Sequence, residues 1–566
     1  MESVSLLHRE GLKHVLEIDL FHLGGSAALL GILLHTTIFR TSFPVEKHMY
    51  NLLGLYAATI LSLSYAYLSL TELSPLQGLG RVSLIAISFN TGLISSMSIY
   101  RLFFHRLHHF PGPFGAKLTR FYDASLAAKN VQYNVEIRKL HEQYGDFVRT
   151  GPREISILRK SALPLIYGPQ TECRKSTWYD QLYTDTRKVC MNLSRDSDDH
   201  RRRRKAWDRA FSIKSIGIYE PRVRAQADKL ISQIEANIGK PLDVTAWSMF
   251  FSFDIMGDVG FGKDFGNLSS GREHPAIKAV HDHMLLIGVV SHVPWLLNLL
   301  GRIPGAAAGY RSFFRWCADQ IEAKRKSWDS GSYPQDIISW ILKAFIDNDV
   351  SAPPSELALH DDSRVVVVAG SDTTAISLAN TIYYLAKHPG VLTKLQAQLD
   401  EVMRGGPEDW TYDKAKRVTY TDDIINESLR LRPAVMTGGY RVTPSRGLQV
   451  DEVFIPGDVN VCVPPQLIHT DERYYKAPNG FIPERWGERK VEMGTDEAPY
   501  YPFSMGAYGC VGKNLAMLSL RIAVSRLAQR YNITFAPGET GETFIHGAQD
   551  AFITVLPPLQ VVFQPR

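Results

Sequence analysis

Residues 501–520 read YPFSMGAYGCVGKNLAMLSL, and this stretch decides the fold. Its spacing is F-x-x-G-x-x-x-C-x-G, and its four fixed positions are held by Phe503, Gly506, Cys510 and Gly512. After the cysteine, apolar residues recur at steps of four, three and four, which predicts a helix. A thiol just before a helix N-terminus, approached by the backbone N–H groups of glycines, is placed to become a thiolate and a metal ligand. A buried, inert cysteine is the alternative.

This loop resembles the haem-binding loop of the cytochrome P-450 family, the haem-thiolate monooxygenases. The resemblance implies that Cys510 binds the iron of haem b, and that its electron donation favours cleavage of the O–O bond. The family usually has an arginine two residues before the cysteine, whereas this chain has Tyr508. We therefore expect the haem propionates to depend more on three other residues, Arg204, Arg441 and His200.

Size, charge and cysteine content exclude several classes of protein. A chain of 566 residues could hold several domains, but the resemblance implies one large catalytic domain. The net charge of +5 does not indicate a nucleic-acid partner. The five cysteines form no C-x-x-C pair and no zinc-like spacing, which disfavours a disulfide framework or a structural metal site. These features fit a catalytic domain that faces a reducing cytosol.

The first hundred residues contain three uncharged runs, at about 20–39, 49–71 and 82–100. Each is close to the roughly 20 residues that a helix needs to cross a bilayer, so residues 1–107 are predicted to be a membrane region with up to three transmembrane helices. Three buried helices of a soluble domain are the alternative. The third run is more polar than the others, and the basic residues after it favour a cytosolic catalytic side.

The sequence HHFPGPFG at residues 108–115 predicts a stiff, proline-rich hinge. Residues 116–566 are then the catalytic domain. Family members with such a hinge are anchored in the endoplasmic reticulum membrane, and the resemblance implies the same place here, with membrane lipid as a partner.

The stretch DDHRRRRKAWDRAFS at residues 198–212 has the family's pattern for a helix beside the haem. The resemblance places His200 and Arg204, four residues apart on one face, where they donate to a haem propionate. The other basic residues of the stretch are expected to form a solvated face. On the proximal side of a haem, Arg201 and Arg202 could steer an acidic flavoprotein reductase.

A long helix is predicted from about Ser355 to Lys387, ending at the sequence HPG. Its middle matches the family signature A/G-G-x-D/E-T-T at residues 369–374. Oxygen activation requires protons, so the resemblance implies a relay in which Thr373 holds a water molecule and Asp372 connects it to solvent. The alternative for the threonine is a hydroxyl that bonds back to a helix carbonyl.

Three further segments complete the family pattern. The motif NESLRLRP and the motif FIPERW imply a buried structural network that fixes the cysteine loop, made of Glu427, Arg430 and Arg485. Residues 281–305 are too interrupted to span a bilayer and resemble the family's lid over the substrate channel; ordinary core is the alternative. The residues expected to border the substrate pocket are Val365, Ala369, Val435, Thr437 and Phe552.

These motifs predict a mainly α protein with small β-sheets (α+β), the cytochrome P-450 fold, preceded by membrane helices. The implied activity inserts one oxygen atom from O2 into an apolar small molecule, for which a terpenoid or polyketide intermediate of secondary metabolism is our hypothesis. Electrons would come from NADPH through NADPH-cytochrome reductase, with cytochrome b5 as a further candidate donor. Two alternatives are a haem-thiolate isomerase or dehydratase acting without O2, and a haem protein that binds or senses without turnover. The pair Asp372 and Thr373 argues against both.

Overall fold

The computed structural model describes residues 16–40, 45–180, 185–305, 308–329 and 331–566. Contacts divide the chain into two compact units, Met1–Thr119 and Arg120–Arg566. Helices dominate both units in the described residues, and the strands lie in the second unit in four small sheets. The predicted fold class is therefore confirmed.

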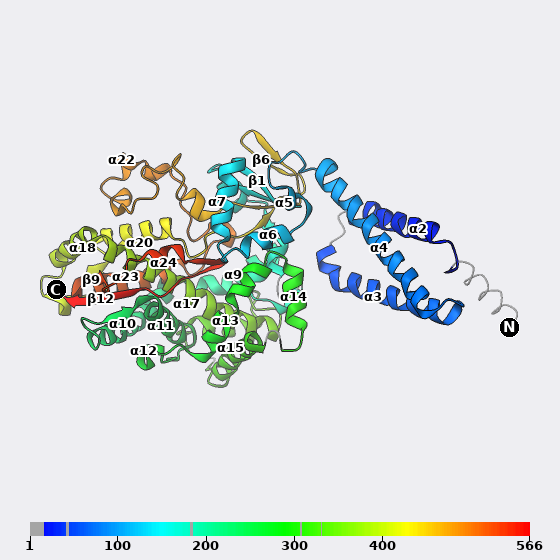
Figure 1. The fold of residues 1–566 in the computed structure, drawn as a ribbon. Helices are drawn as coiled ribbons and strands as arrows, with labels where there is room; N and C mark the ends of the chain where they lie inside the picture. Colours follow the sequence, from blue (N-terminus) through cyan, green and yellow to red (C-terminus); the bar gives the residue numbers. More distant parts are fainter. Residues whose placement is uncertain (1–15, 41–44, 181–184, 306–307, 330) are drawn as a thin grey trace. The chain divides into compact units, whose positions relative to one another are not determined.

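Three long helices form the first unit (Figure 1). By length and composition, Leu20–Phe39, His48–Leu70 and Pro75–Phe104 can each cross a membrane. The third begins earlier than the uncharged run in the sequence, because Ser74 and Gln77 form a capping box ahead of Arg81. The helices of this unit are α2 (Leu20–Leu34), α3 (Val45–Leu70), α4 (Pro75–Ile99) and α5 (Phe114–Leu118), with the π-helical turns η1 (His35–Phe39) and η2 (Tyr100–Phe104).

Two glycines allow α2 and α4 to pack closely. A Cβ atom at Gly31 would lie 2.3 Å from the carbonyl oxygen of Phe89, and one at Gly92 would lie 2.1 Å from that of Ala28. Small residues at such crossings are typical of helix pairs in membranes, where close backbone contact replaces the hydrophobic effect as the source of association.

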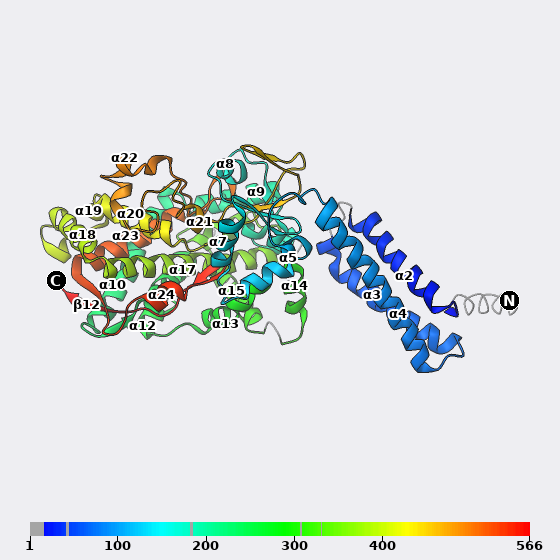
Figure 2. The same cartoon turned by 45° about the horizontal axis from the view of Figure 1, so that its top comes forward.

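The second unit is built around α17 (Glu356–Lys387), which runs through its length (Figure 2). Ser355 caps the helix by accepting a hydrogen bond from the N–H of Ala358, and the helix ends before Pro389. The other helices are α6 (Phe121–Ala127), α7 (Tyr133–Tyr144), α8 (Ala162–Tyr167), α9 (Ser197–Ala210), α10 (Ile213–Glu235), α11 (Val244–Ile255), α12 (Asn267–Ser270), α13 (Pro275–Val290), α14 (Pro294–Arg302), α15 (Ala308–Lys326), α16 (Ile337–Ile346), α18 (Pro389–Val402), α19 (Tyr412–Ala415), α20 (Thr419–Leu431), α21 (Pro465–Ile468), α22 (Lys490–Met493), α23 (Lys513–Arg530) and α24 (Glu542–His546).

The largest sheet has the strand order β1-β2-β8-β5-β3, and a three-stranded sheet has the order β4-β12-β9. In the first, Lys175 on β3 lies directly opposite Arg441 on β5. The strands are β1 (Phe147–Gly151), β2 (Glu154–Ile157), β3 (Arg174–Lys175), β4 (Pro241–Asp243), β5 (Arg441–Val442), β6 (Leu448–Val450), β7 (Val453–Ile455), β8 (Asn460–Cys462), β9 (Tyr531–Phe535), β10 (Gln549–Ala551), β11 (Ile553–Val555) and β12 (Gln560–Pro565).

Helix α17 is held on one side by α11 and by the π-helical turn η6 (Met256–Phe261) that continues α11. A Cβ atom at Gly370 would lie 2.4 Å from the sulfur of Met256, and one at Gly260 would lie 2.9 Å from Cγ1 of Val366. The glycine in the signature of α17 therefore leaves room for the side chain of Met256. Helix α17 is apolar and long enough to span a membrane, but it is mostly buried within this unit and is a core helix.

Candidate active site

The cysteine loop lies between the short 3-10 helix η10 (Gly506–Tyr508) and α23. The N–H of Cys510 donates to the carbonyl oxygen of Phe503 at 2.8 Å, which closes the loop. Gly506 has a φ of 64°, and a Cβ atom there would lie 2.4 Å from the carbonyl oxygen of Tyr167, so only glycine fits. The loop therefore presents the cysteine at the start of α23.

Cys510 is exposed in the structure. Desolvation raises the pKa of its thiol, whereas the backbone N–H groups of Gly512 and Lys513 and the side chain of Arg204 act to lower that pKa. A metal cation bound to the sulfur would lower the pKa of the thiol further, because coordination deprotonates a thiol. The other four cysteines are buried, as expected for core residues.

Helix α9 brings His200 and Arg204 to the same loop. The Nη1 atom of Arg204 donates to the carbonyl oxygen of Gly509 at 2.8 Å, and its Nε donates to Asp208 at 2.7 Å. The ring of His200 lies edge-on to Tyr508, with ring centroids 4.7 Å apart. Burial and the neighbouring cations lower the pKa of His200 to about 2, so this residue is neutral beside Tyr508.

The other basic residues of α9 differ from the predicted solvated face. Arg203 is buried and forms an ion pair with Asp362 of α17 at 2.9 Å. Arg202 donates to the carbonyl oxygens of Val350 and Ala352. The solvated face expected for most of residues 201–205 is therefore limited to Arg201 and Lys205, which are exposed.

Two buried cations lie beside the cysteine loop. Lys175 and Arg441 are opposite each other on β3 and β5, and both lie over the ring of Tyr508, at 4.9 Å and 5.0 Å from its centroid. Neither forms an ion pair with a carboxylate in the described part of the chain. The Nε atom of Arg441 is buried with no hydrogen-bond partner, and burial together with Arg441 lowers the pKa of Lys175 well below its usual value.

This arrangement fits a haem. Like charges opposite each other on paired strands are unfavourable unless an anion lies between them, and two propionate groups would neutralise both cations. The sulfur of Cys510 is a ligand for iron. Sequence reasoning found Arg441 and missed Lys175, because no motif marks it and the pairing of β3 with β5 brings it to the site. Tyr508 replaces the usual arginine as a flat surface on which these cations pack.

The middle of α17 presents one accessible face. Ala369 is exposed, and Val365 and Thr373 are partly exposed, although the helix lies in the core. The hydroxyl of Thr373 donates to the carbonyl oxygen of Ala369 at 2.9 Å. The bond back to the helix, considered for this threonine, is thus present, and it leaves the oxygen free to accept a hydrogen bond from water.

Asp372 is buried, and its carboxylate Oδ1 lies 3.5 Å from Nε2 of His281 on α13. The lid segment therefore contacts the residue expected to relay protons. Sequence reasoning missed His281, because only the packing of α13 near α17 joins residues 91 positions apart in the chain.

The structure brings Glu427, Arg430 and Arg485 together, fully buried, between α20 and the 3-10 helix η8 (Pro483–Trp486). Glu427 accepts hydrogen bonds at 2.8–2.9 Å from both guanidinium groups. Further donors to the same carboxylate are the indole of Trp486 and the N–H of Ile482. The two arginines also donate to five backbone carbonyl groups between residues 469 and 480, which ties α20 to the segment before the cysteine loop.

The expected pocket residues differ in exposure. Val435 is partly exposed, whereas Thr437 is buried. Phe552 lies at the turn between β10 and β11 with a φ of 74°, and its ring packs on Trp178 with centroids 4.3 Å apart. Trp178 is a further candidate for the pocket wall that the sequence alone did not indicate.

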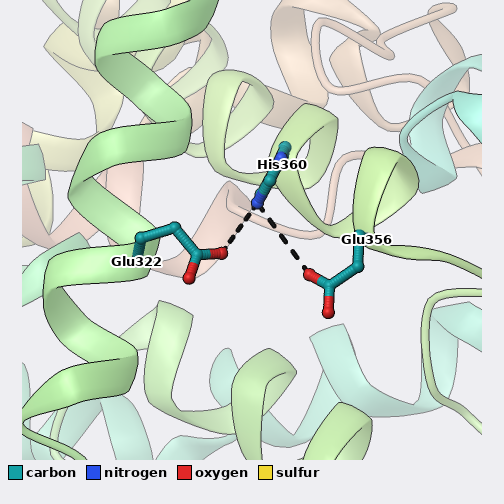
Figure 3. Close-up of side chains that lie close together, drawn as sticks. All are labelled: Glu322, Glu356 and His360. Atoms are coloured by element: carbon teal, nitrogen blue, oxygen red, sulfur yellow. Dashed lines mark hydrogen bonds and ion pairs between the residues drawn. The ribbon is translucent and has the colours of Figure 1, made fainter.

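A second group of polar side chains lies between α15 and α17, where His360 points toward Glu322 and Glu356 (Figure 3). The distances from its Nε2 atom to their carboxylate oxygens are 2.8 Å and 4.0 Å. Arg325 lies beside both carboxylates, 2.8 Å from Glu356 and 3.6 Å from Glu322. Because this guanidinium already forms ion pairs with both carboxylates, we assign the group to helix packing and not to a metal.

Comparison with known proteins agrees with this geometry. Residues 113–563 match the family model "Cytochrome P450". The chain is 36% identical to cytochrome P450 monooxygenase FCK2 of Fusarium pseudograminearum (strain CS3096), over 95% of this chain and 97% of that relative. It is 39% identical to cytochrome P450 monooxygenase orf5 of Eupenicillium brefeldianum, over 84% and 94%. It is 30% identical to tryprostatin B 6-hydroxylase of Aspergillus fumigatus, over 96% of each chain.

Proposed function

The chain belongs to the cytochrome P450 family and is an oxidoreductase that incorporates oxygen, and from this premise we propose that it inserts one atom of O2 into an apolar small molecule of secondary metabolism. Electrons come from NADPH through a flavoprotein reductase. One relative is named a hydroxylase of tryprostatin B, which makes this compound a rational first probe for the pocket.

The observation that carries the proposal is that two buried cations without a carboxylate partner among the described residues lie over Tyr508, in the loop that holds Cys510. Bound haem supplies the iron centre at which O2 is activated. Cys510 holds the iron, and Lys175 and Arg441 hold the haem carboxylates. Arg204 keeps the loop in place through the carbonyl oxygen of Gly509. The remaining site residues hold and move protons or fix the position of the cysteine loop.

Asp372 and Thr373 hold and move protons on the accessible face of α17. Asp372 takes a proton on its carboxylate, and the hydroxyl of Thr373, donating to Ala369, accepts a hydrogen bond from the water that carries that proton onward. Glu427, Arg430 and Arg485 keep the cysteine loop at a fixed distance from α17, because a fully bonded buried network resists displacement. The partly exposed Val365 and Val435, the exposed Ala369 and the ring of Phe552 border the substrate.

The proposal includes a place in the cell. Residues 1–107 anchor the protein in the endoplasmic reticulum membrane, residues 108–115 form a hinge, and residues 116–566 form a catalytic domain that faces the cytosol. Three helices long and apolar enough to span a membrane support the anchor. The basic residues after the third helix support the orientation.

Arg201 and Lys205 are exposed cations of α9 and are the proposed steering charges for an acidic reductase. We expect Arg201→Glu and Lys205→Glu together to slow NADPH oxidation at low salt and to leave haem content unchanged. The difference should vanish at high salt, because salt screens exposed charges. Equal rates at low salt would remove these residues from the reductase interface.

The activity is tested with purified, reduced protein under carbon monoxide. A Soret band at long wavelength, lost in Cys510→Ser, is expected if a sulfur anion binds the iron. Ligands are then screened by the shift of the ferric haem to high spin, starting with tryprostatin B. A protein without the long-wavelength band in any preparation would refute the assignment of Cys510.

A further inference from the structure

Three ionisable side chains form a line from the interior of the second unit to its surface. The Nε2 atom of His281 lies 3.5 Å from Oδ1 of Asp372, and its Nδ1 atom lies 2.6 Å from Oε1 of Glu273. The side chains become more exposed along this line, from 4% for Asp372 to 29% for His281 and 32% for Glu273. The line therefore connects the middle of α17 with solvent.

The charges around His281 favour its protonated form. Burial lowers the pKa of this imidazole, but the hydrogen bonds to Asp372 and to Glu273 outweigh burial and raise it to about 10. Among the described residues, His281 is the cation within ion-pair distance of Asp372. The nearby Lys278 and Asp282 on α13 pair with each other at 2.8 Å, and His283 bonds to the carbonyl oxygen of Ala279 on its own helix.

We propose that His281, oriented by Glu273, is the positioning residue through which Asp372 receives protons from solvent. This inference rests on the proposed function. His281 transfers the proton on Nε2 to Oδ1 of Asp372, so the imidazolium becomes neutral imidazole and the carboxylate becomes a carboxyl group. The partly exposed ring then regains a proton from water at Nε2, while Glu273 accepts the hydrogen bond from Nδ1–H throughout.

The proposal has a structural consequence. His281 belongs to α13, in the segment that resembles a lid, whereas Asp372 belongs to the central helix α17. The proton path is complete only when His281 on α13 lies within reach of Asp372. Proton supply is therefore coupled to the position of α13.

The first test needs no turnover. Histidine-selective NMR of the ferric protein follows each imidazole as pH is raised, and the signal of His281 is identified by its loss in His281→Gln. We expect it to titrate near pH 10 in the unaltered protein and at lower pH in Glu273→Gln, because one of two carboxylates is removed. A signal that titrates near pH 6.5, the ordinary value, in both proteins would overturn the geometry.

The second test uses the products of O2 reduction, with NADPH, a flavoprotein reductase and no added substrate. Reduction of O2 to two water molecules takes four electrons and four protons, whereas release of hydrogen peroxide takes two of each. A slower proton supply therefore favours peroxide. For His281→Gln we expect the ratio of water to peroxide to fall about 100-fold at every pH, the lower end of the contribution of a positioned proton donor.

Glu273→Gln distinguishes proton supply through His281 from a purely structural role of the contact between His281 and Asp372. At pH 6 its His281 is still protonated, so the ratio of water to peroxide should equal that of the unaltered protein. As pH rises through the lowered pKa of His281, the imidazole becomes neutral and the ratio should fall, whereas the unaltered protein stays constant to about pH 9. A pH profile that matches the unaltered protein would overturn the proposal.

His283→Gln is the matched control, since it lies on the same helix and bonds only to the backbone of α13 among the described groups. It should behave as the unaltered protein in both tests. The long-wavelength band under carbon monoxide is recorded for every variant. Its absence from the unaltered protein counts against the proposed function, whereas its presence in all variants with equal product ratios counts against His281 alone.

Discussion

Replacement of Lys175 by methionine tests whether the two buried cations hold the haem. The ammonium group has three donors, and one of them reaches the carbonyl oxygen of Asn192 at 2.6 Å. Two donors remain for a haem carboxylate. Loss of one charge-assisted hydrogen bond costs about 1.5–3 kcal/mol, which corresponds to an affinity about 10- to 150-fold weaker.

The assay follows transfer of haem from the holoprotein to an excess of apomyoglobin, and a faster loss is expected in Lys175→Met. Lys205→Met is the control, because it removes the same charge from the exposed face of α9. Arg441→Ala should also lose haem readily, since Tyr508 brings no charge to replace it. Haem loss from Lys175→Met at the rate of Lys205→Met would refute the role of the buried lysine.

The affinity for haem should depend on pH through the protonation of Lys175. Burial and Arg441 hold the pKa of Lys175 well below its usual value, and an anion beside it raises that pKa again. The haem-bound state therefore binds more protons at this residue, so haem affinity should fall as pH rises through the alkaline range. Lys175→Met should lose this dependence, which a series of haem-transfer rates against pH measures.

Three further results are expected. Cys510→Ser should abolish the long-wavelength Soret band of the reduced carbon monoxide complex, and retention of the band would exclude this sulfur as the ligand. Glu427→Gln should destabilise the protein by about 3–5 kcal/mol in urea denaturation, because it leaves two buried guanidinium groups short of an anion; Glu492→Gln, at an exposed ion pair, should change stability far less. Thr373→Val should increase peroxide release without loss of haem, since it removes the hydroxyl and keeps the shape of the side chain, and an unchanged peroxide yield would remove Thr373 from the relay.

The sequence was most informative where a motif is local. The helix predicted from Ser355 to Lys387 is α17, with Ser355 as its cap. The spacing of Glu427 and Arg430 likewise led directly to a buried pair. Helical periodicity, capping residues and ion-pair spacing are short-range properties, so a single chain displays them without its fold.

The sequence alone therefore indicated the family, the helical fold class and the candidate site residues Cys510, Asp372 and Thr373. Each of these is carried by a motif of residues close together in the chain. The tertiary structure decided the rest. The pairing of β3 with β5 brings Lys175 to Arg441, the docking of α13 brings His281 to Asp372, and packing on α17 buries Arg203. These contacts join positions far apart in the chain. The packing of the folded chain, and not residue type, decides which buried cations have no carboxylate partner among the described residues and which histidine is neutral.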